Sequence, residues 1–143
     1  MDLTKSWVLF ALGSAFFAGP TALLGKLGVA GINSNMATLI RVVVIFAVTA
    51  ALVASRSEWQ RLDTISAKTW LFLVLSGIAT GLSWLCYYRA LQLGPVSRVA
   101  PIDKLSVVVA IVLGVVVAGE TLTWPIALGG ALIVSGTIVM IAF

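Results

Sequence analysis

The sequence predicts an all-α membrane protein, a bundle of five transmembrane helices. Of its 143 residues, 61% are hydrophobic and only 10% are charged, whereas a soluble domain has roughly 45–50% apolar residues. The mean hydropathy is +1.15. A hydrocarbon core about 30 Å thick needs about 20 apolar residues per helix. The apolar residues fall into five stretches of about that length.

The five expected spans cover residues 7–26, 34–54, 69–92, 96–119 and 124–141, in a single domain 1–143. Only residues 55–68, which are rich in charged side chains, look like a longer loop. Trp7, Trp70 and Trp124 stand at the starts of the first, third and fifth stretches. In a chain that crosses back and forth, these three starts lie at one membrane face, where Trp is enriched. This alignment supports the count of five independently of hydropathy.

The first span has one alternative interpretation, a signal peptide. A basic residue, Lys5, before a short apolar run is also typical of a signal peptide. No small-residue cleavage site follows cleanly, and the apolar run continues through Leu24, so we expect a retained helix. Pro20 interrupts this helix and frees the carbonyl of Phe16. Broken helices often mark binding sites in transporters, although kinked packing is as common.

Each of the first four spans carries small or polar residues at helical spacing. Lipid offers no hydrogen bonds, so polar side chains in a span should face protein or a water-filled cavity. The clearest stripe is on the third span, where four such residues fall within a sector of roughly 60°. We expect the four stripes to line a substrate path. The residues assigned to it are Ser14, Thr21, Asn35, Thr38, Ser76, Thr80, Ser83, Trp84, Tyr87 and Ser106.

Helix packing is the alternative explanation of such stripes, because membrane helices associate through small residues. Residues 77–81 form a GxxxG pattern. The fifth span has a small-residue interior that is nearly free of polar groups, which favours close approach to a neighbouring helix or to a second copy. The residues assigned to helix packing or dimer contact are Gly77, Gly81, Ala127, Gly130, Ala131 and Ser135.

Charged residues inside a span cost roughly 2.5–3.5 kcal/mol, so they tend to be paired, interfacial or functional. Snorkelling is a sufficient account of the charges near span ends, Lys26, Arg98 and Glu120. Arg41 lies deeper, and Asp103 with Lys104 forms an adjacent pair. These three residues are assigned to ion coupling or ion pairing.

The role of Asp103 depends on where its helix begins. Pro101 disfavours a helical conformation for the residue before it, so the fourth span begins or kinks there. If the helix begins at Pro101, Asp103 complements the helix dipole from the first turn. If it begins near Ser97, Asp103 lies roughly 10 Å deep. At that depth it would hold a transported proton or contact a cationic substrate.

Several function classes are excluded by what the sequence lacks. There is no His and only one Cys, Cys86, which excludes a metal cluster and an intrachain disulfide. Nucleotide-binding fingerprints and a nucleophile–base pair are also missing, so we expect no cofactor and no enzyme. The net charge of +4 suits the anionic head groups of a lipid bilayer better than nucleic acid.

A family resemblance follows from three segments: residues 86–97 (CYYRALQLGPVS), residues 100–106 (APIDKLS) and residues 119–122 (GETL), with Gly129 and Gly136 after them. Together they resemble the EamA-type repeat of the drug/metabolite transporter superfamily, in its single-repeat, five-helix branch. The positions that match the pattern are Tyr88, Ala90, Leu91, Ser97, Pro101 and Glu120. The resemblance implies export of small metabolites, amino acids or toxic compounds by alternating access.

The odd number of spans has a consequence for assembly. Two tandem five-helix repeats in one chain are inverted relative to each other, which gives the pseudo-two-fold axis that alternating access uses. A single repeat recovers that symmetry only with an oppositely inserted copy or a paralogue. The basic residues on the N-terminal side are Lys5, Arg56, Arg61 and Lys68; those on the other side are Lys26, Arg89 and Arg98, with Arg41 and Lys104 if embedded charges count. The totals are close, so orientation is weakly specified.

We therefore predict a secondary transporter or exporter of small organic metabolites or drugs, working as an antiparallel homodimer or a paralogue heterodimer. Its expected location is the inner membrane of a bacterium or archaeon. Two alternatives stay open. One is a subunit of a lipid-carrier flippase, whose stripes would accept a head group while the tail stays in lipid. The other is a membrane subunit that assembles with partners and does not transport.

Overall fold

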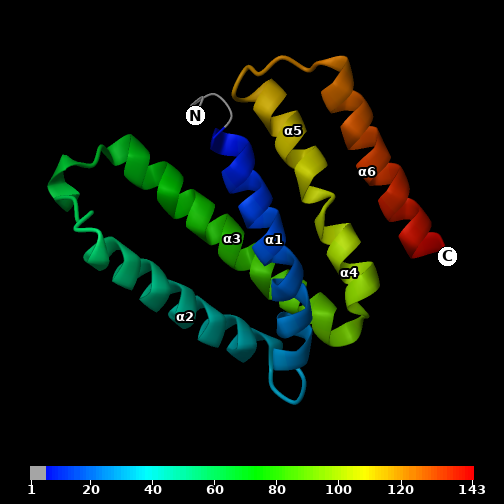
Figure 1. The fold of residues 1–143 in the computed structure, drawn as a ribbon, viewed down its shortest axis with the longest axis horizontal. Coiled ribbons are helices and arrows are strands. Elements are labelled where there is room, and N and C mark those ends of the chain that lie inside the picture. Colours follow the sequence, from blue (N-terminus) through cyan, green and yellow to red (C-terminus); the bar gives the residue numbers. More distant parts are fainter. Residues whose placement is uncertain (1–5) are drawn as a thin grey trace. The chain divides into compact units, whose positions relative to one another are not determined.

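The computed structural model describes residues 6–143. In this part of the chain, five helical segments are long and apolar enough to cross a membrane. They are built from α1 (Ser6–Gly28), α2 (Ser34–Ser55), α3 (Ala67–Leu93), α4 (Val96–Asp103), α5 (Ser106–Val116) and α6 (Trp124–Ala142), with α4 and α5 sharing one span (Figure 1). The protein is thus an integral, multi-pass membrane protein. The predicted all-α membrane fold is confirmed.

Most helix ends lie within two residues of the expected span ends. The third span begins earlier, at Ala67, because the Oγ of Ser66 accepts a hydrogen bond of 3.1 Å from the backbone N–H of Thr69. The fourth span ends earlier, at Val116, and Gly119 beyond it adopts φ 71°, a conformation that glycine takes without strain. Lys5, which entered the charge balance, lies outside the described residues.

The chain divides into two compact units. The first contains residues 6–22 of the described chain together with 94–143, and the second contains residues 23–93. Helix α1 contributes to both, since the boundary falls after Ala22.

In the second unit, α2 and α3 pack side by side along a hairpin (Figure 1). Residues 56–66 connect them through a short 3-10 helix, η2 (Leu62–Thr64). At the opposite end of the hairpin, the last turns of α1 join the packing: Val29 and Leu91 are almost completely buried, and Tyr88 is 5% exposed. A Cβ on the buried Gly25 would lie 3.3 Å from both Leu91 and Tyr88. The core of this unit is therefore the junction of α1, α2 and α3, which we call the three-helix junction (residues 25–38 and 88–92).

In the first unit, α6 packs against both α4 and α5. Gly130 is buried on α6, where an added Cβ would lie 3.7 Å from Ile111 of α5. Val99 of α4 and Thr137 of α6 are also buried. Most other large apolar side chains of the spans are exposed. In a membrane these surfaces face lipid or another protein chain.

Candidate substrate-binding and coupling site

Lys26 caps the end of α3. The carbonyl of Leu91 would ordinarily accept from the backbone N–H four residues on, but that residue is Pro95, which has none. The ammonium of Lys26 donates to this carbonyl over 2.6 Å. A cation at this position also complements the negative end of the helix dipole. Lys26 thus has a specific acceptor on another helix, beyond the snorkelling that its place in the sequence suggests.

Gln92 links the same junction to the connection between α1 and α2. Its Nε2 donates to the carbonyl of Ile32 over 2.9 Å, and its Oε1 accepts from Nη1 of Arg89 over 2.7 Å. The bond to Ile32 ties the end of α3 to the connection that precedes α2, and the bond from Arg89 holds the Gln92 side chain in place. Residues 88–92 of the motif at residues 86–97 therefore form the α3 side of the three-helix junction.

Arg41 lies in the second turn of α2, roughly 10 Å from the start of that span. Its guanidinium carbon is 4.4 Å from the centroid of the Trp84 ring and 5.4 Å from that of Tyr88. Cation–π contacts contribute about 0.5–2 kcal/mol, against the roughly 2.5–3.5 kcal/mol that a charge inside a span costs. The two aromatic rings therefore offset part of the cost, and an acceptor for the N–H groups would offset the rest.

The charges of the second unit are unevenly distributed. Lys26, Arg41 and Arg89 all lie at or near the three-helix junction. The unit's two carboxylates, Glu58 and Asp63, lie in the connection at the opposite end of the hairpin. There they pair with neighbouring arginines, Arg61 to Asp63 at 2.6 Å and Arg56 to Glu58 at 4.0 Å. The junction consequently carries a local excess of positive charge.

The other predicted path residues of this unit are spread along α2 and α3. Thr38 is buried and donates to the carbonyl of Ser34 over 2.9 Å. Asn35 is exposed in the first turn of α2, where its backbone N–H donates to the side chain of Asn33. On α3, Trp84 meets Arg41, and Tyr87 meets Tyr88 edge to face at a centroid distance of 6.3 Å. The remaining members, Ser76, Thr80 and Ser83, are exposed on α3.

Three predicted path residues belong to the first unit. Ser14 and Ser106 are exposed, and Thr21 donates to the carbonyl of Phe17 over 2.8 Å. Their role in a path shared with the α2 and α3 residues stays a prediction.

The fourth span is broken in its middle. It begins at Val96, directly after the N-cap residue Pro95, so the earlier of the two expected starts holds. Asp103 ends α4, roughly 10 Å along the span. The backbone N–H groups of Lys104 and Leu105 then bond three residues back, to Pro101 and Ile102, before α5 begins. The ammonium of Lys104 is 3.5 Å from the carboxylate of Asp103. The predicted pair thus lies at a helix discontinuity.

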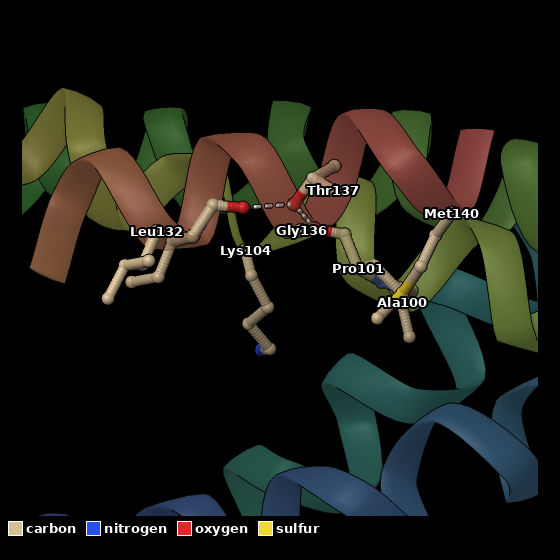
Figure 2. Close-up of a pocket in the computed structure, with 8 residues that line it drawn as sticks. Ala100, Pro101, Lys104, Leu132, Gly136, Thr137 and Met140 are labelled. Carbon is tan, nitrogen blue, oxygen red and sulfur yellow. Dashed lines mark hydrogen bonds between the residues drawn. The ribbon is translucent and has the colours of Figure 1, made fainter. Parts of the chain in front are cut away.

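A groove of about 460 Å³ runs between α4 and α6 beside this break. Its lining is mostly apolar: Ala100, Pro101, Lys104, Leu132, Ile133, Gly136, Thr137 and Met140 (Figure 2). The hydroxyl of Thr137 lies within hydrogen-bond distance of two carbonyls, Ile133 at 2.8 Å and Pro101 at 3.3 Å. Thr137 therefore ties α6 to the broken span. Sequence reasoning missed this residue because a single Thr in an apolar helix gives no signal of its partner.

The small residues assigned to packing occupy different environments. Gly130 packs within the chain, against Ile111 of α5. An added Cβ at Gly77 or Gly81 would meet no atom within 4 Å. Ala131 and Ser135 are exposed, and Ala127 is half-buried. These open faces are available to lipid or to a second chain, and their use in a dimer stays a prediction.

Comparison with known proteins gives two matches. The model of the EamA-like transporter family matches residues 5–142. A protein described as an uncharacterized transporter in the cobO 3′ region of Sinorhizobium sp is 52% identical over 141 residues, which cover 99% of this chain and all of that relative. No solved structure is significantly similar. The relative thus has the same single-repeat length.

Proposed function

The chain belongs to the EamA-like transporter family, and we propose that it exports small organic solutes across the inner membrane as a secondary transporter, by alternating access between two copies. A transporter role agrees with the family and with the name of the bacterial relative. The observation that carries the finer proposal is the broken fourth span with Asp103 and Lys104 beside the break. Discontinuous helices with charged groups near the midplane are typical of substrate and ion sites in secondary transporters.

Export is tested by reconstitution. Liposomes that hold the purified protein are loaded with a defined mixture of amino acids and other small organic solutes, and the content that remains is measured by mass spectrometry over time. The proposal expects loss of particular solutes that depends on the protein. A lipid-carrier flippase would instead move a labelled lipid between leaflets without solute loss, and an assembly subunit would do neither.

Dual insertion is the second requirement of the proposal. A single five-helix repeat needs an inverted copy to obtain the symmetry of alternating access. The exposed faces around Gly77 and Gly81 would allow close approach of that copy. With one reporter active only inside and another active only outside, each fused after Phe143, we expect activity from both. Activity from one reporter alone would contradict the antiparallel homodimer and point to an oppositely oriented paralogue.

Asp103 provides a test of ion coupling. Replacing it by Asn removes the carboxylate beside Lys104 and keeps the size of the side chain. If Asp103 carries the coupled proton, Asp103→Asn should abolish the dependence of solute efflux on an imposed pH gradient. Glu58→Gln, which removes a carboxylate from the exposed α2–α3 connection, is the matched control and should leave that dependence intact. Unchanged pH dependence in Asp103→Asn would assign Asp103 a structural role at the helix break.

A further inference from the structure

We infer that Arg41, held against Trp84 and Tyr88, binds the anionic group of an organic solute, a carboxylate or a phosphate. This inference names the substrate class of the proposed transporter and so rests on the proposed function. The site consists of one guanidinium and two aromatic rings within the second unit. It does not involve Asp103, which belongs to the first unit.

The first argument is that the donors of Arg41 are open. Its contacts in the described chain are the two ring contacts, and no oxygen of the described residues accepts a hydrogen bond from it. Arg41 is half-buried, yet none of its unbonded nitrogen atoms is fully enclosed. A guanidinium has five N–H donors in its plane and no acceptor capacity. The two rings attract the cation and offer no oxygen acceptor, so its N–H donors stay available to a ligand.

The second argument is geometric. Carboxylates and phosphates bind a guanidinium along its edge, through two parallel N–H···O bonds. Aromatic rings attract it as a cation that lies over the ring. The contacts of Arg41 with Trp84 and Tyr88 occupy no oxygen acceptor, so they leave N–H donors for an anion and at the same time hold the group in place. Such preorganisation reduces the entropy that a ligand loses on binding.

The third argument is charge. Arg41 shares its end of the hairpin with Lys26 and Arg89, whereas both carboxylates of the second unit lie in the connection at the other end. Lys26 already donates to the Leu91 carbonyl, and Arg89 already donates to the side chain of Gln92. The positive potential of the junction is thus left uncompensated by any acidic residue of that unit. It favours an anion and disfavours a cation at Arg41.

Trp84 supplies a local readout, because an anion at Arg41 alters the environment of the ring beneath it. A single-tryptophan variant keeps Trp84 and replaces the other tryptophans by Phe, at Trp7, Trp59, Trp70 and Trp124. The purified variant in zwitterionic phosphatidylcholine nanodiscs is titrated with benzoate, with neutral benzamide and with cationic benzylamine. We expect a saturable fluorescence change with benzoate alone. An equal response to benzylamine or benzamide would overturn the inference.

Substitutions in the same background assign the effect to Arg41. Arg41→Gln should weaken benzoate binding by about tenfold or more, as expected for loss of a charge-assisted hydrogen bond. Lys68→Gln is the matched control, because Lys68 also lies over an aromatic ring, that of Phe72 at 6.0 Å, but at the other end of α3. Its benzoate affinity should not change. Benzoate affinity within twofold of the parent in Arg41→Gln would also overturn the inference.

If Arg41→Gln does not fold, the site is tested in the unmutated protein with phenylglyoxal, a reagent that modifies arginine. Peptide mass spectrometry follows Arg41 and Arg56, the latter lying in the exposed α2–α3 connection. Benzoate should slow the modification of Arg41 and leave that of Arg56 unchanged. No protection of Arg41 at benzoate concentrations that saturate the fluorescence change would reject the site.

The anion can come from a solute or from a lipid head group, and the bilayer distinguishes these sources. In nanodiscs with added phosphatidylglycerol, unchanged benzoate affinity indicates a solute site, whereas competition indicates a site for lipid phosphate; both support anion binding by Arg41. The efflux assay separates this inference from the proposed function. Export of cationic solutes by a protein that does not bind benzoate would support the transporter proposal and reject the anion site. Benzoate binding without any efflux would support the anion site and reject the transporter proposal.

Discussion

Replacing Lys26 by Met is expected to destabilise the protein by about 1.5–3 kcal/mol, the usual loss for a hydrogen bond to a charged group. Lys26 donates to the Leu91 carbonyl over 2.6 Å, and Pro95 provides no backbone N–H in its place. Met removes the ammonium and replaces one methylene by sulfur, and it keeps the apolar length of the side chain. The measurement is reversible unfolding of the purified protein by SDS in mixed micelles, followed by circular dichroism.

Two variants control this expectation. Lys68→Met removes an exposed ammonium at the start of α3 and should change stability by less than about 0.5 kcal/mol. Lys26→Arg keeps a cationic donor and should recover part of the loss. Equal stability of Lys26→Met and Lys68→Met would show that the capping bond contributes nothing measurable, and would return Lys26 to the role of a snorkelling cation.

The fold class and the number of spans were predictable because both follow from one-dimensional quantities. A helix of about 20 apolar residues can cross the hydrocarbon core with its backbone hydrogen bonds satisfied internally, whichever helices lie beside it. The break in the fourth span was half predictable. Pro101 marks the region, but the discontinuity itself falls at residues 104–105, where the backbone switches to bonds three residues back. The local sequence thus identifies a region in which the helix is weakened, but it does not give the residue at which the helical hydrogen bonding breaks.

Contacts between helices were not predictable in this way. Arg41 was assigned to ion coupling or pairing, and the structure places it over Trp84 and Tyr88. Helical periodicity gives the face of each residue but not the register between two helices, and register decides which rings meet a cation. The Lys26 cap had a local signal, since Pro95 stands four residues after Leu91. That signal identifies a carbonyl that needs a hydrogen-bond donor. It does not predict that Lys26 of another helix provides the donor.

Ser83→Leu and Tyr87→Leu are expected to abolish solute efflux, a loss of tenfold or more, and to leave folding and assembly unchanged. Ser83 is exposed and Tyr87 half-buried on α3, so an apolar side chain at either position is compatible with the fold. If Ser83 and Tyr87 line the path, each substitution removes a hydrogen-bonding group that contacts the solute. A desolvated polar solute then lacks this hydrogen-bond partner, which makes its passage unfavourable. The efflux assay measures the loss, and size-exclusion chromatography checks assembly.

Cys86→Leu is the matched control for these two variants. It introduces the same residue on the same helix, about 100° from Tyr87 and about 60° from Ser83 around the helix axis, outside the sector of the stripe. A path along the Ser83–Tyr87 face predicts that Cys86→Leu transports normally while the other two variants do not. Loss of assembly in Ser83→Leu or Tyr87→Leu, with Cys86→Leu intact, would instead make this face an interface between chains. The stripe on α3 would then pack helices, and the substrate path would have to run elsewhere.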